Sequence, residues 1–167
     1  LWPPALARAA AERDELEGLA RAAGDDLELA GWDWSYYADK LRAERFDFDE
    51  GAVKPYLELE SVRQAAFEVA GKLFGITFSE RTDVPVYHPD VRAWEVSDAD
   101  GSHVGLFYTD YLARESKRGG AWMDSFREQW RRADGSEVRP IVVNVCNFAP
   151  PGEGQPVLLS LDEAATL

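Results

Sequence analysis

The chain has 167 residues, enough for one domain with a hydrophobic core, and its apolar fraction of 46% excludes a disordered or low-complexity polypeptide. Its 31 acidic and 18 basic residues give a formal charge of −13. A charge of this sign and size repels nucleic acid and anionic lipid, so we expect neither a nucleic-acid nor a membrane partner.

The cysteine content and the first residues bear on where the protein works. Cys146 is the only cysteine, which excludes an intrachain disulfide and fits a cytoplasmic location. The segment from Leu1 to Arg13 lacks the pattern of a signal peptide, and no apolar run approaches the roughly 20 residues that span a bilayer. Because the only methionine is Met123, we expect the natural translation start to lie upstream.

The first segment has the signals of a helix. Pro3 and Pro4 suit a helix start, and the alanine- and leucine-rich sequence after them predicts a helix to about Ala23. Gly24 is placed to end this helix, and residues 25–31 read as a loop.

Two further helices are predicted before the middle of the chain. Asp33 suits the N-cap of a helix that runs to about Arg45, and we assign the aromatic cluster from Trp32 to Tyr37 to packing. After the break at Pro55, apolar residues recur at three- and four-residue steps until Gly75 closes the run. The apolar positions of this third helix are Leu57, Val62, Ala65, Ala66, Val69, Ala70, Leu73 and Phe74.

From Gly75 the apolar period changes to two, which indicates strands. Asp98 to Gly101 form the turn of a hairpin; they also echo a calcium loop, but its remaining ligand positions are absent, so the turn is favoured. Asp134 and Gly135 form another turn. The predicted strands are residues 76–78, 91–96, 104–111, 119–126 and 141–148, the last one buried and central.

The last residues predict the beginning of another helix. After a loop over residues 150–156 and a short extended stretch at 157–159, Ser160 and Glu163 form a capping box. Only the residues up to Leu167 follow, with no glycine, asparagine or proline to stop the helix. We therefore expect the chain to be cut off inside this helix.

Together these elements predict an α+β fold. N-terminal helices are followed by a mixed, mainly antiparallel sheet and by the start of one more helix. Residues 1–75 form the helical segment and residues 76–167 the sheet portion of what we expect to be one structural unit.

The residues show no catalytic centre by themselves. His88 and His103, the only histidines, lack the partner at i+4 that a helical metal site has, so we expect His88 in a turn and His103 in solvent. No Gly-x-Ser-x-Gly elbow is present, and Cys146 lies in a predicted buried strand, where its thiol pKa is raised. No spacing of carboxylates selects one pair as general acid and base.

Several longer segments occur in one order from about Trp32 to the last residue, and together they resemble the thimet oligopeptidase family of zinc peptidases. The Trp-Asp-Trp and Tyr-His-Pro-Asp segments look closest to the bacterial peptidyl-dipeptidases, and Arg131 to Gly135 is similar to oligopeptidase A. The segments that carry the resemblance are Gly31–Tyr37, Lys54–Tyr56, Val86–Arg92, Ser116–Met123, Asn144–Phe148, Gly154–Pro156 and Asp162–Leu167.

The resemblance implies a function for the whole protein and a limit for this chain. In the family, the helix after the Asp162-Glu163 pair carries a His-Glu-x-x-His motif that binds Zn²⁺ and supplies the general base, and it is expected just beyond Leu167. The parent is then a zinc metallopeptidase that hydrolyses short peptides. We therefore expect this chain to be a fragment that needs the remainder of the catalytic domain, and we expect it to have no catalytic residue and to bind no zinc by itself.

The resemblance also implies a substrate-binding segment. Gly119, Gly120, Ala121 and Trp122 are expected to form a sheet edge along which the peptide substrate pairs antiparallel. The alternative is that these glycines only release a bend at the strand entrance. The rival for the function is a self-contained acidic α+β binding or scaffold module that has no catalytic half.

Overall fold

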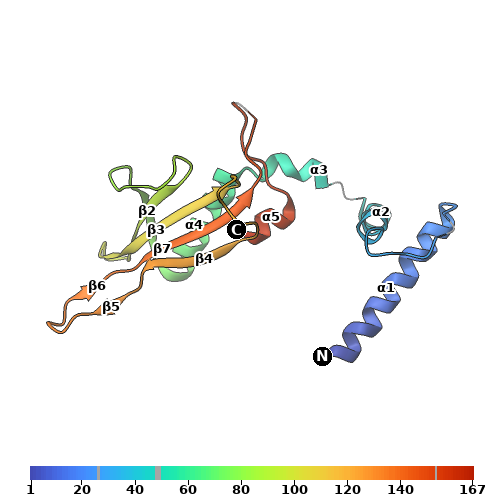
Figure 1. Ribbon diagram of the computed structural model, residues 1–167, viewed down its shortest axis with the longest axis horizontal. Coiled ribbons are helices and arrows are strands. Elements are labelled where there is room, and N and C mark those ends of the chain that lie inside the picture. Colours follow the sequence, from blue (N-terminus) through green and yellow to red (C-terminus); the bar gives the residue numbers. More distant parts are fainter. Residues whose placement is uncertain (26, 48–49, 153) are drawn as a thin grey trace. The chain divides into compact units, whose positions relative to one another are not determined.

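The computed structural model describes residues 1–25, 27–47, 50–152 and 154–167. They form two compact units, Leu1–Glu50 and Gly51–Leu167 (Figure 1). The loops predicted at 25–31 and 150–156 each include one residue, 26 and 153 respectively, that lies outside the described residues. The sequence-based division at residue 75 stays a prediction about domains.

The first unit is a pair of helices, α1 (Trp2–Ala22) and α2 (Trp34–Phe46), which end within one residue of the predicted positions. Its buried residues are Leu16, Ala20 and Tyr37. The Tyr37 hydroxyl donates to the Asp25 carboxylate at 2.8 Å. The assignment of the aromatic cluster to packing is right for Trp34 and Tyr37 and wrong for Tyr36 and Trp32. Tyr36 is 57% exposed, and Trp32, which precedes α2 in a turn, is 86% exposed.

The second unit combines helices and strands. Its elements are α3 (Glu50–Val53), η1 (Lys54–Tyr56), α4 (Leu59–Phe74), β1 (Thr77–Glu80), β2 (Arg92–Ser97), β3 (His103–Leu112), β4 (Trp122–Arg127), β5 (Trp130–Arg131), β6 (Glu137–Val138), β7 (Ile141–Phe148) and α5 (Leu161–Thr166). The strands of the main sheet follow the order β1-β2-β3-β7-β4, in which only β3 and β7 are parallel. The predicted α+β fold with a mixed, mainly antiparallel sheet is confirmed.

Helix α4 packs on one face of this sheet through aromatic side chains. The Phe67 ring stacks on Phe78 with centroids 4.0 Å apart and meets Trp94 edge-on at 5.0 Å. The Arg63 guanidinium lies 4.4 Å from the centroid of the Trp94 ring, which covers a buried cation with a π-face.

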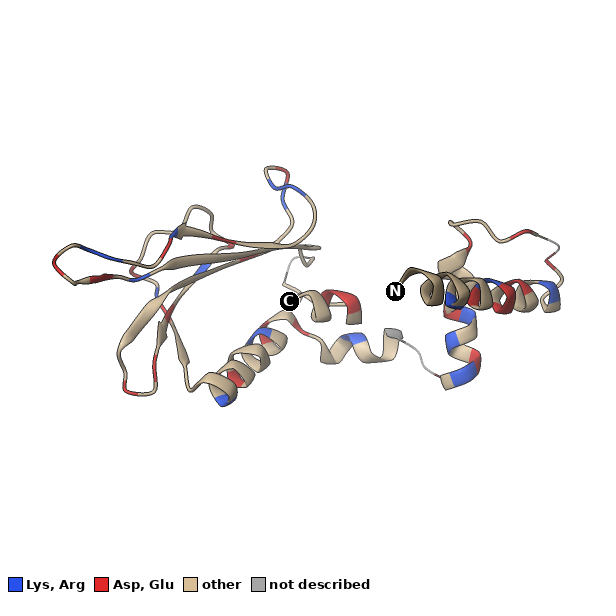
Figure 2. Cartoon of the chain, turned by 90° about the horizontal axis from the view of Figure 1, so that it is seen from below, with Lys and Arg blue, Asp and Glu red and all other residues tan. Residues whose placement is uncertain are grey.

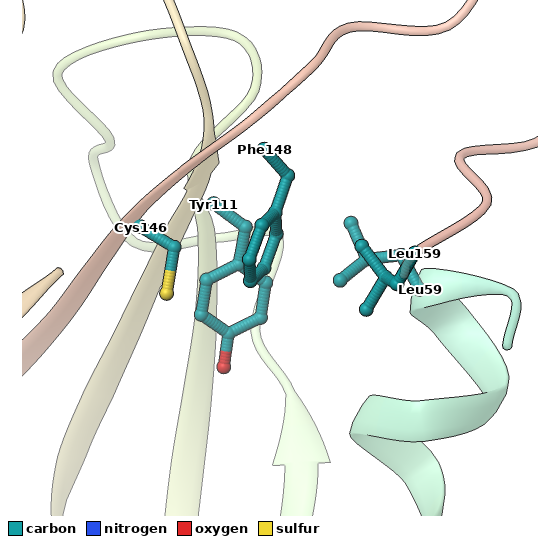
Figure 3. Close-up of a cluster of buried hydrophobic side chains, with 5 residues drawn as sticks. All are labelled: Leu59, Tyr111, Cys146, Phe148 and Leu159. Carbon is teal, nitrogen blue, oxygen red and sulfur yellow. The ribbon is translucent and has the colours of Figure 1, made fainter. Parts of the chain in front are cut away.

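A cluster of buried side chains joins the start of α4 to β3, β7 and the segment before α5 (Figure 3). Figure 3 shows Leu59 and Leu159 side by side, next to the rings of Tyr111 and Phe148. Main-chain bonds between Leu59 and Val157 and between Leu159 and Leu57 hold the two segments together. The full cluster is Leu59, Tyr111, Cys146, Phe148 and Leu159.

Helix α5 starts as the sequence predicts. The Ser160 Oγ accepts from the Glu163 N–H at 3.1 Å, and the Glu163 carboxylate accepts from the Ser160 N–H at 2.8 Å. This capping box satisfies two of the N–H groups that a helix start leaves without a partner.

The other face of the sheet has its own buried cluster, made of Val91, Ala93, Tyr108, Val143 and Val145. Basic and acidic residues are interspersed along the helices and loops of each unit (Figure 2). Within the part of the chain that the structure describes, no helix is both long enough and apolar enough to cross a membrane.

Candidate functional site

Strand β4 lies at one margin of the five-stranded sheet, next to β7 (Figure 1). Its register with β7 places Trp122 opposite Val145 and Asp124 opposite Val143. The other side of β4 is therefore a sheet edge, where main-chain N–H and C=O groups can pair with another extended chain.

The strand begins at Trp122, so the prediction of a strand from Gly119 is wrong by three residues. Gly120 has φ +93°, a left-handed conformation that cannot continue a strand. In place of ladder bonds, the Asn147 side-chain amide donates to the carbonyl oxygens of Arg118 and Gly120, each at 2.7 Å. A side chain of β7 thus holds the segment that leads into β4.

The two glycines of this segment differ in what requires them. The positive φ of Gly120 explains why this position is a glycine, because residues with a side chain rarely adopt such a φ. Gly119 has no such φ, and a Cβ added to it would meet nothing within 4 Å. Nothing within the described chain explains Gly119, whereas a glycine at an edge leaves room for an approaching backbone.

A buried group of charges anchors the loop between β3 and β4. Asp110, near the end of β3, is 2% exposed and accepts from Arg114 at 2.7 and 2.8 Å and from Lys117 at 3.0 Å. The Tyr87 hydroxyl donates to the same carboxylate at 2.8 Å. Every partner of this carboxylate carries a positive charge or a hydroxyl, so the buried negative charge is compensated.

Lys117 joins this group to the central strand. Its ammonium donates to the carbonyl oxygens of Asp110 at 2.9 Å, Leu112 at 2.8 Å and Cys146 at 2.5 Å. Its side chain is only 5% exposed. The loop that ends at Gly119 is therefore fixed to both β3 and β7.

These contacts shift the titration of two groups. Burial raises the pKa of Asp110, but the hydrogen bonds from its three donors outweigh burial and bring the pKa down to about 2. Burial and the bond to Asp110 raise the pKa of Tyr87 to about 12. At neutral pH Asp110 is an anion and Tyr87 keeps its proton.

A hollow of about 400 Å³ lies beside β4. Trp122 and Phe126 of β4 line it together with Tyr87, Val143 and Val145. The charged group of Asp110, Arg114 and Lys117 also borders it. Aromatic side chains thus line one part of this hollow, and the hydrogen-bonded charged group lines another.

The histidines and the cysteine lie apart from this hollow. His88 is in a turn, where its carbonyl oxygen accepts from the Val91 N–H at 3.0 Å, as predicted. His103 is exposed and lies 3.0 Å from the Glu95 carboxylate. Cys146 is buried, and burial raises the pKa of its thiol as predicted. Among the described residues, no three His, Cys, Asp or Glu side chains gather in a way that could hold a metal ion.

Sequence reasoning missed Asp110, Asn147 and their partners. One signal was available, because an aspartate inside the apolar run Val104–Leu112 is rarely buried unless it is paired. The sequence does not predict which residues pair with Asp110, because Tyr87 lies far before it in the chain and Arg114 lies shortly after it.

The chain is similar in sequence to known peptidases. Residues 4–167 match the model of peptidase family M3. The chain is 46% identical over 166 residues to a dipeptidyl carboxypeptidase of Salmonella typhimurium and 44% identical to one of Escherichia coli, covering 99% of this chain in both cases. It is 41% identical over 156 residues to oligopeptidase A of Escherichia coli, covering 93% of this chain.

The alignments cover nearly all of this chain but only part of each relative. The chain spans 24% of the dipeptidyl carboxypeptidases and 23% of oligopeptidase A, which is about a quarter of their length. Because the family model matches almost every residue, the chain belongs to peptidase family M3.

Proposed function

We propose that this chain is the peptide-binding part of a longer zinc-dependent enzyme that hydrolyses short peptides. The observation that carries the proposal is the sheet edge of β4, which lies beside a hollow and follows Gly119, a glycine that no contact within the described chain explains. The similarity to dipeptidyl carboxypeptidases and to oligopeptidase A supports peptides as the ligand. The substrate pairs antiparallel with β4 near Gly119, Gly120, Ala121 and Trp122.

Peptidase family M3 is zinc-dependent, and the described residues of this chain do not fit a zinc site. The His88 Nδ1 accepts from the Asp90 N–H at 3.3 Å, and the His103 Nδ1 lies 3.0 Å from the Glu95 carboxylate, so neither histidine belongs to a ligand cluster among the described residues. We therefore assign no step of the hydrolysis to this chain. Zinc and the reacting groups belong to the part of the longer protein outside these 167 residues.

Exposed apolar side chains indicate that another part of the longer protein packs on this chain. On α4, Val69 is 53% exposed, Leu73 69% and Phe74 71%. A hollow of about 360 Å³ beside α4 is lined largely by apolar residues, among them Phe67, Phe107 and Leu167. Such surfaces are costly in water and typical of interfaces, so we propose that the remainder of the catalytic domain covers them.

Binding can be tested on the chain as it is. Acetylated short peptides added to the 167-residue chain should shift the amide NMR signals of Ala121 and Met123. Gly119→Val should weaken binding by placing a branched side chain at the edge, while the fold is kept because the site is open. Gly152→Val is the matched control, since Gly152 also lacks a positive φ and its nearest neighbours are 3.8 Å away. Equal binding by both variants would contradict the proposed edge.

Hydrolysis is tested separately. The full-length gene product should cleave such peptides and lose this activity with a zinc chelator, whereas the 167-residue chain should cleave none. Chelator-sensitive hydrolysis by the 167-residue chain, or a full-length product that is inactive toward all short peptides, would overturn the proposal.

A further inference from the structure

The free side of β4 differs between its two ends, and Ser125 marks the change. The Ser125 N–H donates to the Asp124 carboxylate at 2.7 Å. Successive residues of an antiparallel strand alternate between facing their partner strand and facing away from it. An N–H that bonds to the preceding side chain is outside the ladder with β7, so Ser125 faces the free edge.

The same alternation assigns the other residues of the strand. Trp122 and Asp124 direct their main-chain groups toward Val145 and Val143 of β7. Met123 and, one step before the strand, Ala121 direct theirs to the free edge, as Ser125 does. These are the main-chain groups that an added peptide strand would use.

A bulge reinforces the change at Ser125. The register of β4 with β7 shifts between Ser125 and Arg127, which leaves Phe126 as an extra residue. Beyond the shift, the Arg127 side chain donates to the Arg139 carbonyl oxygen at 2.9 Å. Bulges bend an edge strand and end pairing with another chain.

The opposite end of the edge is accessible. The Asn147 side chain fixes the carbonyl groups of Arg118 and Gly120 from the β7 side. Gly119 and Gly120 face empty space. Ala121 and Met123 therefore offer their main-chain groups to an added strand, whereas the edge is obstructed from Ser125 to Arg127.

We propose that Asp124 is a specificity-determining residue that limits the length of peptide able to pair with β4. This inference rests on the proposed function, in which the peptide lies antiparallel to β4, so the amino-terminal side of the peptide points toward Ser125. The Asp124 carboxylate occupies the Ser125 N–H, which would otherwise donate to a peptide carbonyl. The peptide residue opposite Ser125 then gains no bond from the Ser125 N–H, and the bulge that follows ends the pairing beyond it.

The test is a length series measured on the 167-residue chain. Acetylated peptides that share their carboxyl-terminal residues and grow at the amino end, from tripeptide to hexapeptide, are titrated by calorimetry. With the wild-type chain the affinity should rise little once the peptide extends past Met123, because the Ser125 N–H is already occupied. With Asp124→Ala the hexapeptide should bind about threefold to tenfold more tightly than it binds the wild type, the value of one exposed hydrogen bond, while the tripeptide is unchanged.

A second variant separates the blocked N–H from the charge. Asp124→Asn keeps a side-chain oxygen that can accept from Ser125 and removes the negative charge, so it should behave like the wild type. Equal gains in both variants would overturn the proposal in favour of simple charge repulsion. Peptide binding with an unchanged length limit in Asp124→Ala would overturn the limit alone. No binding of any peptide by the wild type would overturn the binding edge as well.

Discussion

The side-chain amide of Asn147 lies 2.7 Å from the carbonyl oxygen of Gly120 and gives the segment before β4 a bond that the strand ladder does not supply. It makes a second bond of 2.7 Å to Arg118. A residue of a central strand therefore positions the entrance of the edge strand. Loss of these bonds should loosen the entrance and leave the sheet intact.

Asn147→Ala should make the Trp122 amide exchange with solvent about tenfold faster, because two exposed hydrogen bonds contribute on the order of 1 to 2 kcal/mol to local stability. Hydrogen exchange followed by NMR measures this effect. Asn147→Asp, which has the same shape and no donor, should show the same acceleration. An unchanged exchange rate of the Trp122 amide in both variants would mean that the start of β4 does not depend on the Asn147 side chain.

Lys117→Met should lower the free energy of unfolding of the second unit by about 3 kcal/mol. The change leaves the buried Asp110 with one cation fewer and removes the donor to three carbonyl oxygens. Urea unfolding, followed on amide signals of β3 and β7, gives the value. Lys72→Met is the control, since Lys72 is exposed on α4 and its loss should cost less than about 0.5 kcal/mol. Equal losses of unfolding free energy in the two variants would show that the charge and hydrogen bonds of Lys117 do not stabilise the second unit.

Asp110 should make the stability of the second unit depend on acid. Its pKa in the folded chain is about 2, below the value of about 3.9 for an unfolded aspartate. The contribution of Asp110 to the free energy of unfolding is therefore full above about pH 4 and is lost as the pH falls toward 2. With a shift of this size, the stability gap between wild type and Asp110→Asn should narrow by about 2 kcal/mol over that range. A gap that stays constant from pH 6 to pH 2 would contradict the assignment.

The elements that the sequence predicts well are those with a strong apolar period. The predicted strand at residues 141–148 matches β7 at both ends, because a valine-rich run between turns suits a strand buried on both faces. The predicted helix after Pro55 matches α4 at its end, where Gly75 takes a left-handed conformation. The two short strands β5 and β6 were not predicted, although their turn at Gly135 was.

The candidate site was less readable because tertiary contacts define it. The start of β4 depends on the Asn147 side chain, which lies 27 residues from Gly120 along the chain. The length limit depends on Asp124 bonding to its own neighbour at a sheet edge. Neither contact produces a periodic pattern in the sequence. The family resemblance therefore predicts the segment from Gly119 to Trp122, but not the side chains that position it.

Gly105→Ala should destabilise the second unit by about 1 to 3 kcal/mol, the usual cost of an extra carbon in a packed site. A Cβ on Gly105 would lie 2.8 Å from the Pro140 carbonyl oxygen and 3.0 Å from the Pro140 ring. This oxygen accepts from the Leu106 N–H at 3.1 Å, just where the parallel pairing of β3 with β7 begins. The added methyl group should therefore push the two central strands apart at their first shared bond.

Gly119→Ala is the matched control for this effect, because a Cβ there meets nothing within 4 Å and the residue has no positive φ. Its unfolding free energy in urea should stay within about 0.5 kcal/mol of the wild type. The two glycines thus separate two uses of the same residue: Gly105 is required by a backbone inside the fold, and Gly119 leaves room for one outside it. If both variants lost the same stability, Gly119 would be a structural glycine and its place at the peptide edge would have to be explained by the fold alone.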